Sequence, residues 1–436
     1  MKLSEQTTIL FLWCFSSFVT PYAVAESLEI SVQRALQTNP QMSASIQDYL
    51  ASKAQVNIAM GNFLPQVNLI ADGGRETIEL EGEPETDLDR RNVELELRLP
   101  LFKGFANVEQ RRQADLGQKA AYYLSLERAE QIALQLSKAY LDVLRSKEIV
   151  ILSLENLTHH EKTFDLVHAR QNQGVADKAD LSQIRGRLAR SRANLLSARN
   201  NLRDAETTYF EISGFAPTTL IRPRIDKSYL PNSNEQALEI AMANSQSVFA
   251  SHFSAKSLSA AAKSLDSHYY PEFDLVASRV WRDETGGFYG TKDESRILLE
   301  MKWNLFSGGQ KSNQHKKALY QAESAKMRTS QVLRETKANV DSSWSAYRTL
   351  EKEITYLQEY VKQTKETEKL YAVQFNVGRR SLLDLLDSQN ELFQSRKAYV
   401  AADYDYVYAQ YRVIASMSYI LDALHVNVME GLSNES

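Results

Sequence analysis

The chain has 436 residues and a formal net charge of −4, because 51 Lys and Arg residues nearly balance 55 Asp and Glu residues. The lack of a basic excess and of a phosphate-binding loop motif argues against a protein that binds nucleic acid or nucleotides. With only 16 glycines and 9 prolines, the composition predicts long regular elements rather than many short ones.

The first 25 residues have the pattern of a secretory signal peptide. Lys2 precedes an apolar run over residues 9–19, and Ala-Val-Ala at 23–25 supplies a small-x-small cleavage site. A run of about eleven residues is shorter than the roughly 20 that a transmembrane helix needs, which disfavours a membrane anchor. Cys14, the one cysteine, lies in this segment. We therefore predict an exported mature chain with no disulfide and no cysteine metal site.

The sequence repeats itself with an offset close to 204 residues. A Leu-Phe-x-Gly motif at 101–104 recurs at 305–308, and Asn-x-Gly at 172–174 recurs at 376–378, so both pairs are 204 positions apart (305 − 101 and 376 − 172). Such self-similarity indicates an internal duplication. Each copy is expected to hold a helix, a strand pair and a long helical hairpin, and the predicted units are 26–222 for the first repeat, 223–424 for the second and 425–436 for a short C-terminal tail.

A strand pair is predicted at 66–101 and another at 272–305. Their residues alternate between apolar and mostly charged side chains, and aromatic residues bracket the strands. A soluble antiparallel sheet with one wet face would explain the alternation alone. Strands of about 10 residues with aromatic brackets favour the wall of a transmembrane barrel. Four strands cannot close a barrel, so several chains would have to contribute, and the even strand number does not distinguish two chains from three.

The helices are predicted to be unusually long. Residues 106–171 contain no proline and a single glycine, Gly117, so one helix there would reach about 100 Å at 1.5 Å per residue. Apolar and small residues recur at heptad spacing in this segment and in the segment that follows the turn near 174, and the pattern returns around the second turn near 378. We expect antiparallel helical hairpins. An isolated coiled-coil stalk would leave the strand pairs unexplained.

Each long hairpin reverses at a glycine that is followed by a helix start. After Gly378, Ser381 is the expected N-cap with Asp384 three residues on, which is the spacing of a capping box. Asp177 and Asp180 have the same arrangement after Gly174. Capping does not explain Asp387, which follows Asp384 by about one turn.

The run Asn-Val-Gly-Arg-Arg-Ser-Leu-Leu-Asp-Leu-Leu-Asp at 376–387 resembles the periplasmic tip motif of the TolC family. The duplicated layout, the Leu-Phe-x-Gly corners and the heptads resemble that family over nearly the whole mature chain. The resemblance implies a mainly α fold with β structure, in which three copies form a 12-stranded transmembrane β-barrel from four strands per chain. A long α-helical coiled-coil barrel would continue it from the outer membrane into the periplasm.

The same resemblance implies the functional residues. Arg380 corresponds to an arginine whose ties to a neighbouring hairpin hold the tunnel shut, and Asp180 to its acidic partner. Phe375 stands where some members have tyrosine, and Ala179 where a threonine would be, which leaves the pair of Arg380 and Asp180 as the main expected latch. The implied periplasmic gate is Arg380, Asp180, Asp384, Asp387 and Phe375, and the implied adaptor-contact tips are Gly174, Val175, Gly378, Arg379 and Ser381.

Asp384 and Asp387 have two interpretations. In a threefold pore they would form carboxylate rings that favour cations. Alternatively, they cap a helix and are solvated.

Catalytic and metal-binding motifs are missing from the sequence. His159, His160 and His168 form the one concentration of histidines, but no two lie at the i, i+4 spacing of a zinc motif. No serine lies in a nucleophile elbow, and the mature chain has no catalytic cysteine. We expect neither an enzyme nor a cofactor or metal site.

The predicted function is the exit duct of a tripartite export system. Its implied partners are a periplasmic adaptor protein, an inner-membrane ABC transporter or other pump, and outer-membrane lipid, without nucleic acid. The stretches at 73–76 and 303–309 look more like members that serve type I protein secretion than like drug-efflux members. Multidrug efflux stays the alternative, and a soluble periplasmic adaptor or scaffold is the alternative from another class.

Overall fold

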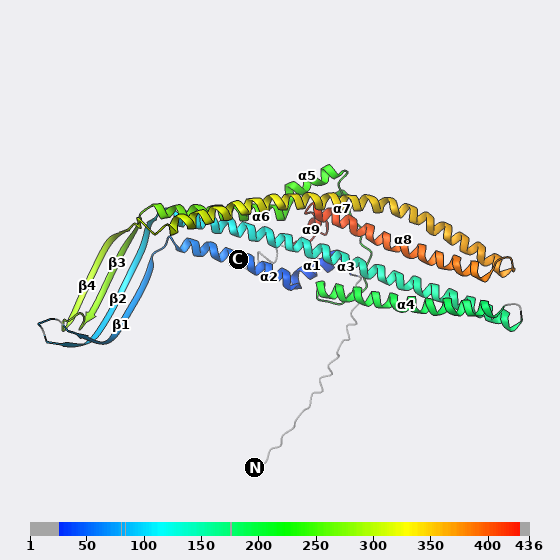
Figure 1. Ribbon diagram of the computed structural model, residues 1–436, viewed down its shortest axis with the longest axis horizontal. Coiled ribbons are helices and arrows are strands. Elements are labelled where there is room, and N and C mark those ends of the chain that lie inside the picture. The colour runs from blue at the N-terminus through cyan, green and yellow to red at the C-terminus, as the bar shows by residue number, and fades with distance from the viewer. Residues whose placement is uncertain (1–25, 80, 83, 175–176, 428–436) are drawn as a thin grey trace, which may run out of the picture.

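The computed structural model describes residues 26–79, 81–82, 84–174 and 177–427. The predicted signal peptide, Val175 and most of the predicted C-terminal tail lie outside these residues. The molecule is elongated, with a β-sheet at one end, the turns of two helical hairpins at the other, and short helices near the middle (Figure 1).

The chain is mainly helical with one four-stranded sheet, as predicted. The first half contains, in order, α1 (Leu28–Thr38), α2 (Pro40–Gly61), β1 (Gln66–Ile78), β2 (Thr86–Lys103), α3 (Ala106–Asn172) and α4 (Lys178–Ser213). The second half contains η1 (Lys227–Tyr229), α5 (Asn234–Asn244), α6 (Gln246–Ser264), η2 (Leu265–Tyr269), β3 (Glu272–Asp283), β4 (Thr291–Lys302), α7 (Gln310–Asn376), α8 (Leu382–Ser416) and α9 (Ile420–Ala423).

The strands form one antiparallel sheet in the order β1-β2-β3-β4. The pairing of β2 with β3 joins the two halves of the chain and places Leu97 opposite Ala277. β4 ends at Lys302, three residues before the predicted bound. Its partner β3 begins directly after Pro271, which has no amide hydrogen to extend the ladder, so Lys302 pairs with Glu272 and the pairing stops there.

The two faces of the sheet differ in chemistry. One face exposes apolar side chains, including Val67, Leu69, Ile297 and Leu299, whose exposed fractions are 62, 70, 78 and 65%. The opposite face carries ion pairs. Arg98 lies 2.9 Å from Glu300, a nitrogen–oxygen distance that joins β2 to β4 across the strand between them.

Beyond the sheet, the long helices lie side by side. α3 packs against α2 and α6 near the sheet, and against α4 and α8 toward the turns (Figure 1). The predicted heptad positions are mostly buried, including Leu136, Val143, Ile184 and Leu188. Small residues at the seams let the helices approach closely. Ser395 of α8, for example, is fully buried and its hydroxyl lies 2.7 Å from that of Thr364 on α7.

The largest apolar core lies where the short helices α1 and α9 cover α3 and α8. Tyr140 of α3 is fully buried there, and its hydroxyl oxygen lies within hydrogen-bond distance of the carbonyl oxygens of Glu26 and Ile221, at 2.7 and 2.6 Å. Within the described part of the chain, no helix has an apolar stretch long enough to cross a membrane.

Candidate functional site at the hairpin tips

The first hairpin turns at Gly174, whose φ of +73° is the left-handed conformation that glycine adopts without strain. α4 starts after Asp177, whose carboxylate accepts a 2.7 Å hydrogen bond from the amide of Asp180. Asp177 is therefore the N-cap, as predicted, and Asp180 stands in the first helical turn with its side chain partly exposed.

The second hairpin turns at Gly378, with φ +78°, and α8 starts with the predicted capping box. The amide of Asp384 donates to the hydroxyl of Ser381 at 3.1 Å, and the amide of Ser381 donates back to the Asp384 carboxylate at 3.4 Å. Asp384 thus satisfies a backbone donor at the helix start. The capping interpretation of this residue has direct support within one chain.

Arg380 folds back on its own hairpin. Its Nε donates to Oε1 of Gln374 at 2.9 Å, its guanidinium lies 4.2 Å from the centre of the Tyr371 ring, and Nη1 is 3.8 Å from Asp384. Among the residues that the structure describes, Arg380 makes no ion pair with Asp180. The resemblance implies a tie from Arg380 to a neighbouring hairpin, and within the described part of one chain Arg380 contacts its own hairpin instead. A latch between Arg380 and Asp180 of two different copies stays a prediction.

Phe375 is buried between the two hairpins, with an exposed fraction of 7%. It belongs to an apolar cluster that all four long helices contribute to: Val167, Leu181, Ile184, Phe375, Leu382, Leu385 and Leu386. The guanidinium of Arg170, on α3, lies 4.7 Å from the centre of the Phe375 ring and donates to the carbonyl oxygen of Asn376 at 3.3 Å. Phe375 therefore anchors the second hairpin to the first.

Asp387 is half exposed and pairs with Arg187 of α4, with Nη2 and Oδ1 2.5 Å apart. Two further ion pairs join the hairpins closer to the middle of the molecule, Arg396 with Glu155 at 2.7 Å and Arg145 with Asp405 at 3.1 Å. These pairs form a row along the seam between α8 and the first hairpin.

His160 lies buried close to Arg187, with an exposed fraction of 4%. Burial lowers the pKa of His160 to about 4, and the positive charge of Arg187 adds to the effect. Its Nδ1 has no hydrogen-bond partner among the described residues. A neutral imidazole is therefore enclosed beside the ion pair of Arg187 and Asp387.

Arg170, Arg187 and His160 were missed as site residues by sequence reasoning. Arg187 does lie seven residues after Asp180, a spacing that places both on one face of α4, but nothing in the sequence indicates its partner about 200 residues away. The structure brings Arg380 and Asp384 together within the second hairpin, buries Phe375 between the hairpins and connects Asp387 to the first hairpin. No group of three or more potential metal ligands occurs in the described ranges.

A sequence profile described as "Outer membrane efflux protein" matches residues 31–214 and 237–417, most of the chain. The chain belongs to this family. Among curated relatives, the outer membrane efflux protein BepC of Brucella suis is 25% identical over 90% of this chain and 85% of its own length. The outer membrane protein TolC of Escherichia coli is 23% identical, over 90% of this chain and 82% of TolC.

Solved structures of outer membrane channels have the same fold. The CmeC outer membrane channel of Campylobacter jejuni superposes with a TM-score of 0.80 at 14% identity and covers 94% of this chain and 89% of CmeC. The open state of the MtrE outer membrane channel of Neisseria gonorrhoeae gives a TM-score of 0.75 at 16% identity, covering 90% and 89%. The fold expected from the resemblance to TolC is thereby confirmed at the level of one chain.

Proposed function

We propose that three copies of this chain form an outer-membrane channel that serves as the exit duct of a tripartite export system. Each copy contributes four strands to a 12-stranded barrel and four long helices to a tunnel that reaches into the periplasm. The two halves of the chain are duplicated units that alternate around this assembly. The sheet is the observation that supports this proposal most directly. Its exposed apolar face suits lipid, and its charged opposite face suits water.

The sheet supports a shared barrel for a physical reason. β1 and β4 are edge strands, and each has ladder partners on one side alone among the described residues. Lipid cannot satisfy the backbone donors and acceptors of an open edge, so a sheet with an apolar face in a bilayer has to close. Pairing β4 of one copy with β1 of the next closes it, with lipid against Leu69 and Ile297 and water against Arg98.

At the other end, the hairpin tips act as a gate that adaptor binding opens. Phe375 and the pair of Arg187 and Asp387 hold the two hairpins of each chain together, while Arg380 and Asp180 latch neighbouring copies. Asp384 and Asp387 surround the constriction. Exposed ion pairs contribute only about 0–1 kcal/mol each, so an adaptor's binding energy can overcome them. Gly174, Val175, Gly378, Arg379 and Ser381 meet the adaptor, and an ABC transporter or another inner-membrane pump supplies the energy.

Type I protein secretion is the export pathway that the stretches at 73–76 and 303–309 favour. Multidrug efflux is the second candidate, and the name of the relative BepC, an outer membrane efflux protein, supports it. A deletion strain separates the two. Loss of one large protein from the culture supernatant with unchanged drug sensitivity supports secretion, and the reverse supports efflux.

The channel itself is tested by its assembly state and conductance. In cells, the protein is expected to stay in the membrane fraction after carbonate extraction. After purification in detergent it is expected to have the mass of three chains. Reconstituted in a planar bilayer, it is expected to conduct ions. A stable monomer that is soluble without detergent would sink the proposal and favour the adaptor or scaffold class.

A further inference from the structure

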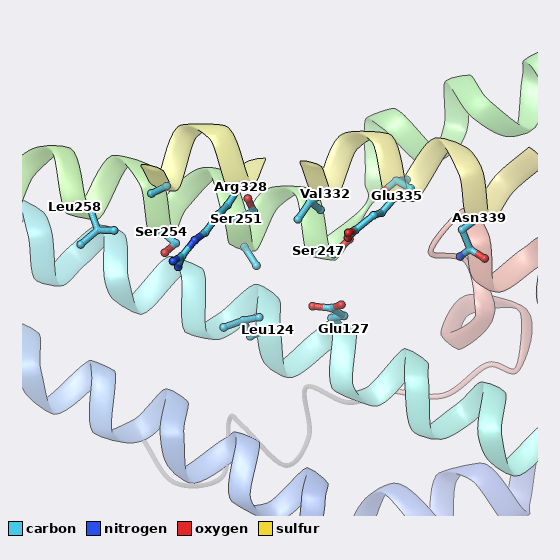
Figure 2. A pocket seen from close by; sticks show the side chains of 13 residues that line it. Leu124, Glu127, Ser247, Ser251, Ser254, Leu258, Arg328, Val332, Glu335 and Asn339 are labelled. Atoms are coloured by element: carbon cyan, nitrogen blue, oxygen red, sulfur yellow. The ribbon is translucent and has the colours of Figure 1, made fainter. Parts of the chain in front are cut away.

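A groove of about 490 Å³ lies between α3, α6 and α7, away from the hairpin tips (Figure 2). It exists because α6 presents small side chains to it, including Ser247, Ala250 and Ser254, while longer side chains project from the flanking helices. A hydrogen bond of 2.8 Å from Ser251 of α6 to Thr329 of α7 ties two of its walls together.

The charged side chains of the groove are separated along its length. Arg328 reaches toward Ser254 at one end, while the carboxylates of Glu127 and Glu335 point into the gap from α3 and α7 (Figure 2). Arg328 and Glu335 are seven residues apart on one helix, which corresponds to about 10 Å. Leu124, Leu258 and Val332 supply apolar lining.

These charges are available to a ligand. Glu127 and Glu335 each accept one hydrogen bond from a neighbouring glutamine of the same helix, at 3.2 and 2.8 Å, and neither forms an ion pair within the described residues. The exposed side chain of Arg328 makes no ion pair or hydrogen bond with any part of the chain that the structure describes.

The groove opens on the side of the helical layer that faces away from α1. Leu124 and Glu127 lie about 140–160° around α3 from Tyr140, at 3.6 residues per turn. Tyr140 is the residue that contacts the segment leading into α1. In the proposed trimer the interior has to stay open, so the short helix α1 has to lie on the outer surface. Because the groove is on the opposite side of α3 from α1, it faces the tunnel.

We propose that this groove is a binding station on the tunnel wall for elongated amphipathic zwitterions. The cationic group of the ligand lies between Glu127 and Glu335, its anionic group lies about 10 Å away at Arg328, and its apolar body covers Leu124 and Val332. That the groove faces the inside of the tunnel rests on the proposed trimeric channel. The arrangement of its charged side chains is seen within one chain.

Two dyes with one ring system test the charge pattern. Rhodamine B is a zwitterion at neutral pH, and rhodamine 6G is an esterified cation without the carboxylate. Their binding to the full-length protein in lipid nanodiscs is measured by fluorescence anisotropy. Because hydrogen bonds to charged groups contribute about tenfold or more in affinity, Arg328→Gln is expected to weaken rhodamine B about tenfold and to leave rhodamine 6G unchanged. The double variant Glu127→Gln/Glu335→Gln weakens both dyes.

Lys326→Gln is the matched control, because Lys326 lies two residues from Arg328 but pairs with Glu323 outside the groove at 3.1 Å. The inference is overturned if Arg328→Gln affects both dyes equally or neither, or if the double variant binds both as the wild type does. Bilayer conductance separates this outcome from failure of the proposed function. If the trimer conducts but none of the variants changes dye binding, the groove proposal alone is rejected. If the protein does not conduct, the channel proposal is rejected.

Discussion

Arg187 of α4 and Asp387 of α8 form an ion pair that joins the two helical hairpins of one chain close to their tips. The pair stands 200 residues apart in sequence. It lies beside the apolar cluster around Phe375, so the hairpins are held by both charge and packing. In the proposed channel, any widening of the tunnel that separates these hairpins has to break this contact.

Arg187→Ala is therefore expected to raise single-channel conductance in planar bilayers. Loss of one such pair costs about 0–1 kcal/mol, and three copies shift the equilibrium between closed and open tips by up to about 100-fold. The charge-swapped variant Arg187→Asp/Asp387→Arg should restore the low conductance. Arg192→Ala is the control, because Arg192 pairs with Glu161 inside the first hairpin. Equal conductance in Arg187→Ala and the wild type would show that the pair is not part of the gate.

Arg380→Ala combined with Asp180→Ala tests the latch between copies. If the two residues hold neighbouring hairpins together, the double variant conducts more than the wild type. The loss of each ion pair again costs about 0–1 kcal/mol. Arg379→Ala, a change to the exposed neighbouring arginine, serves as the comparison. Unchanged conductance in the double variant would mean that Arg380 serves its own hairpin, through Gln374 and Tyr371.

His160→Gln is expected to reduce the loss of stability in acid. The folded chain keeps the pKa of His160 near 4, below the unfolded value of about 6.5, so the unfolded state gains a proton first as the pH falls. The free energy of unfolding is therefore not reduced by His160 above about pH 6.5, and it declines as the pH falls from there toward 4. Between pH 6.5 and 5 the decline is about 2 kcal/mol per chain.

Melting temperatures at pH 7 and pH 5, at one protein concentration, measure this effect. The difference between the two pH values should shrink in His160→Gln and stay at the wild-type size in His252→Gln, which changes an exposed histidine on α6. If His160→Gln and the wild type lose the same stability on acidification, His160 is not the titrating group.

Glu130→Gln should act at the opposite end of the pH range. Burial raises the pKa of Glu130 to about 8, and the nearby carboxylates of Glu127 and Asp422 add to the shift. A carboxyl whose folded pKa lies above its unfolded value stabilises the fold while protonated, so stability declines as the pH rises from about 4.5 to about 8.

The variant is therefore expected to melt at a higher temperature than the wild type at pH 8.5 and at nearly the same temperature at pH 5. Glu323→Gln, at an exposed residue of α7, should show no such difference. Equal melting temperatures of Glu130→Gln and the wild type at pH 8.5 would contradict the prediction.

Gly104→Ala is expected to destabilise the corner between β2 and α3 more than Gly308→Ala destabilises the matching corner before α7. Both glycines have left-handed backbones, with φ of +58° and +61°, which costs a non-glycine residue roughly 1–2 kcal/mol. A Cβ at Gly104 would also lie 2.9 Å from backbone atoms of Ser267, whereas at Gly308 it meets open space. Thermal unfolding of both variants measures the difference, and equal melting temperatures would remove the steric argument.

Local sequence patterns predicted much of this structure. The long helix from Ala106, the capping box at Ser381 and the turns at Gly174 and Gly378 depend on residues within a few positions of one another, so propensity and spacing were sufficient. The alternation in β2 likewise predicted a sheet with one apolar face. The end of β4 was misplaced because it depends on where its partner strand begins.

Contacts between distant segments were decided by the tertiary structure. The sequence could place Asp387 on a helix face, but not opposite Arg187, and it could not bury Phe375 beneath Arg170. The groove at Arg328 is also invisible in the sequence, because its walls come from three separate helices. Periodicity determines which side of a helix is apolar, whereas the rotation and offset of one long helix against another depend on how all the side chains at their seams pack together.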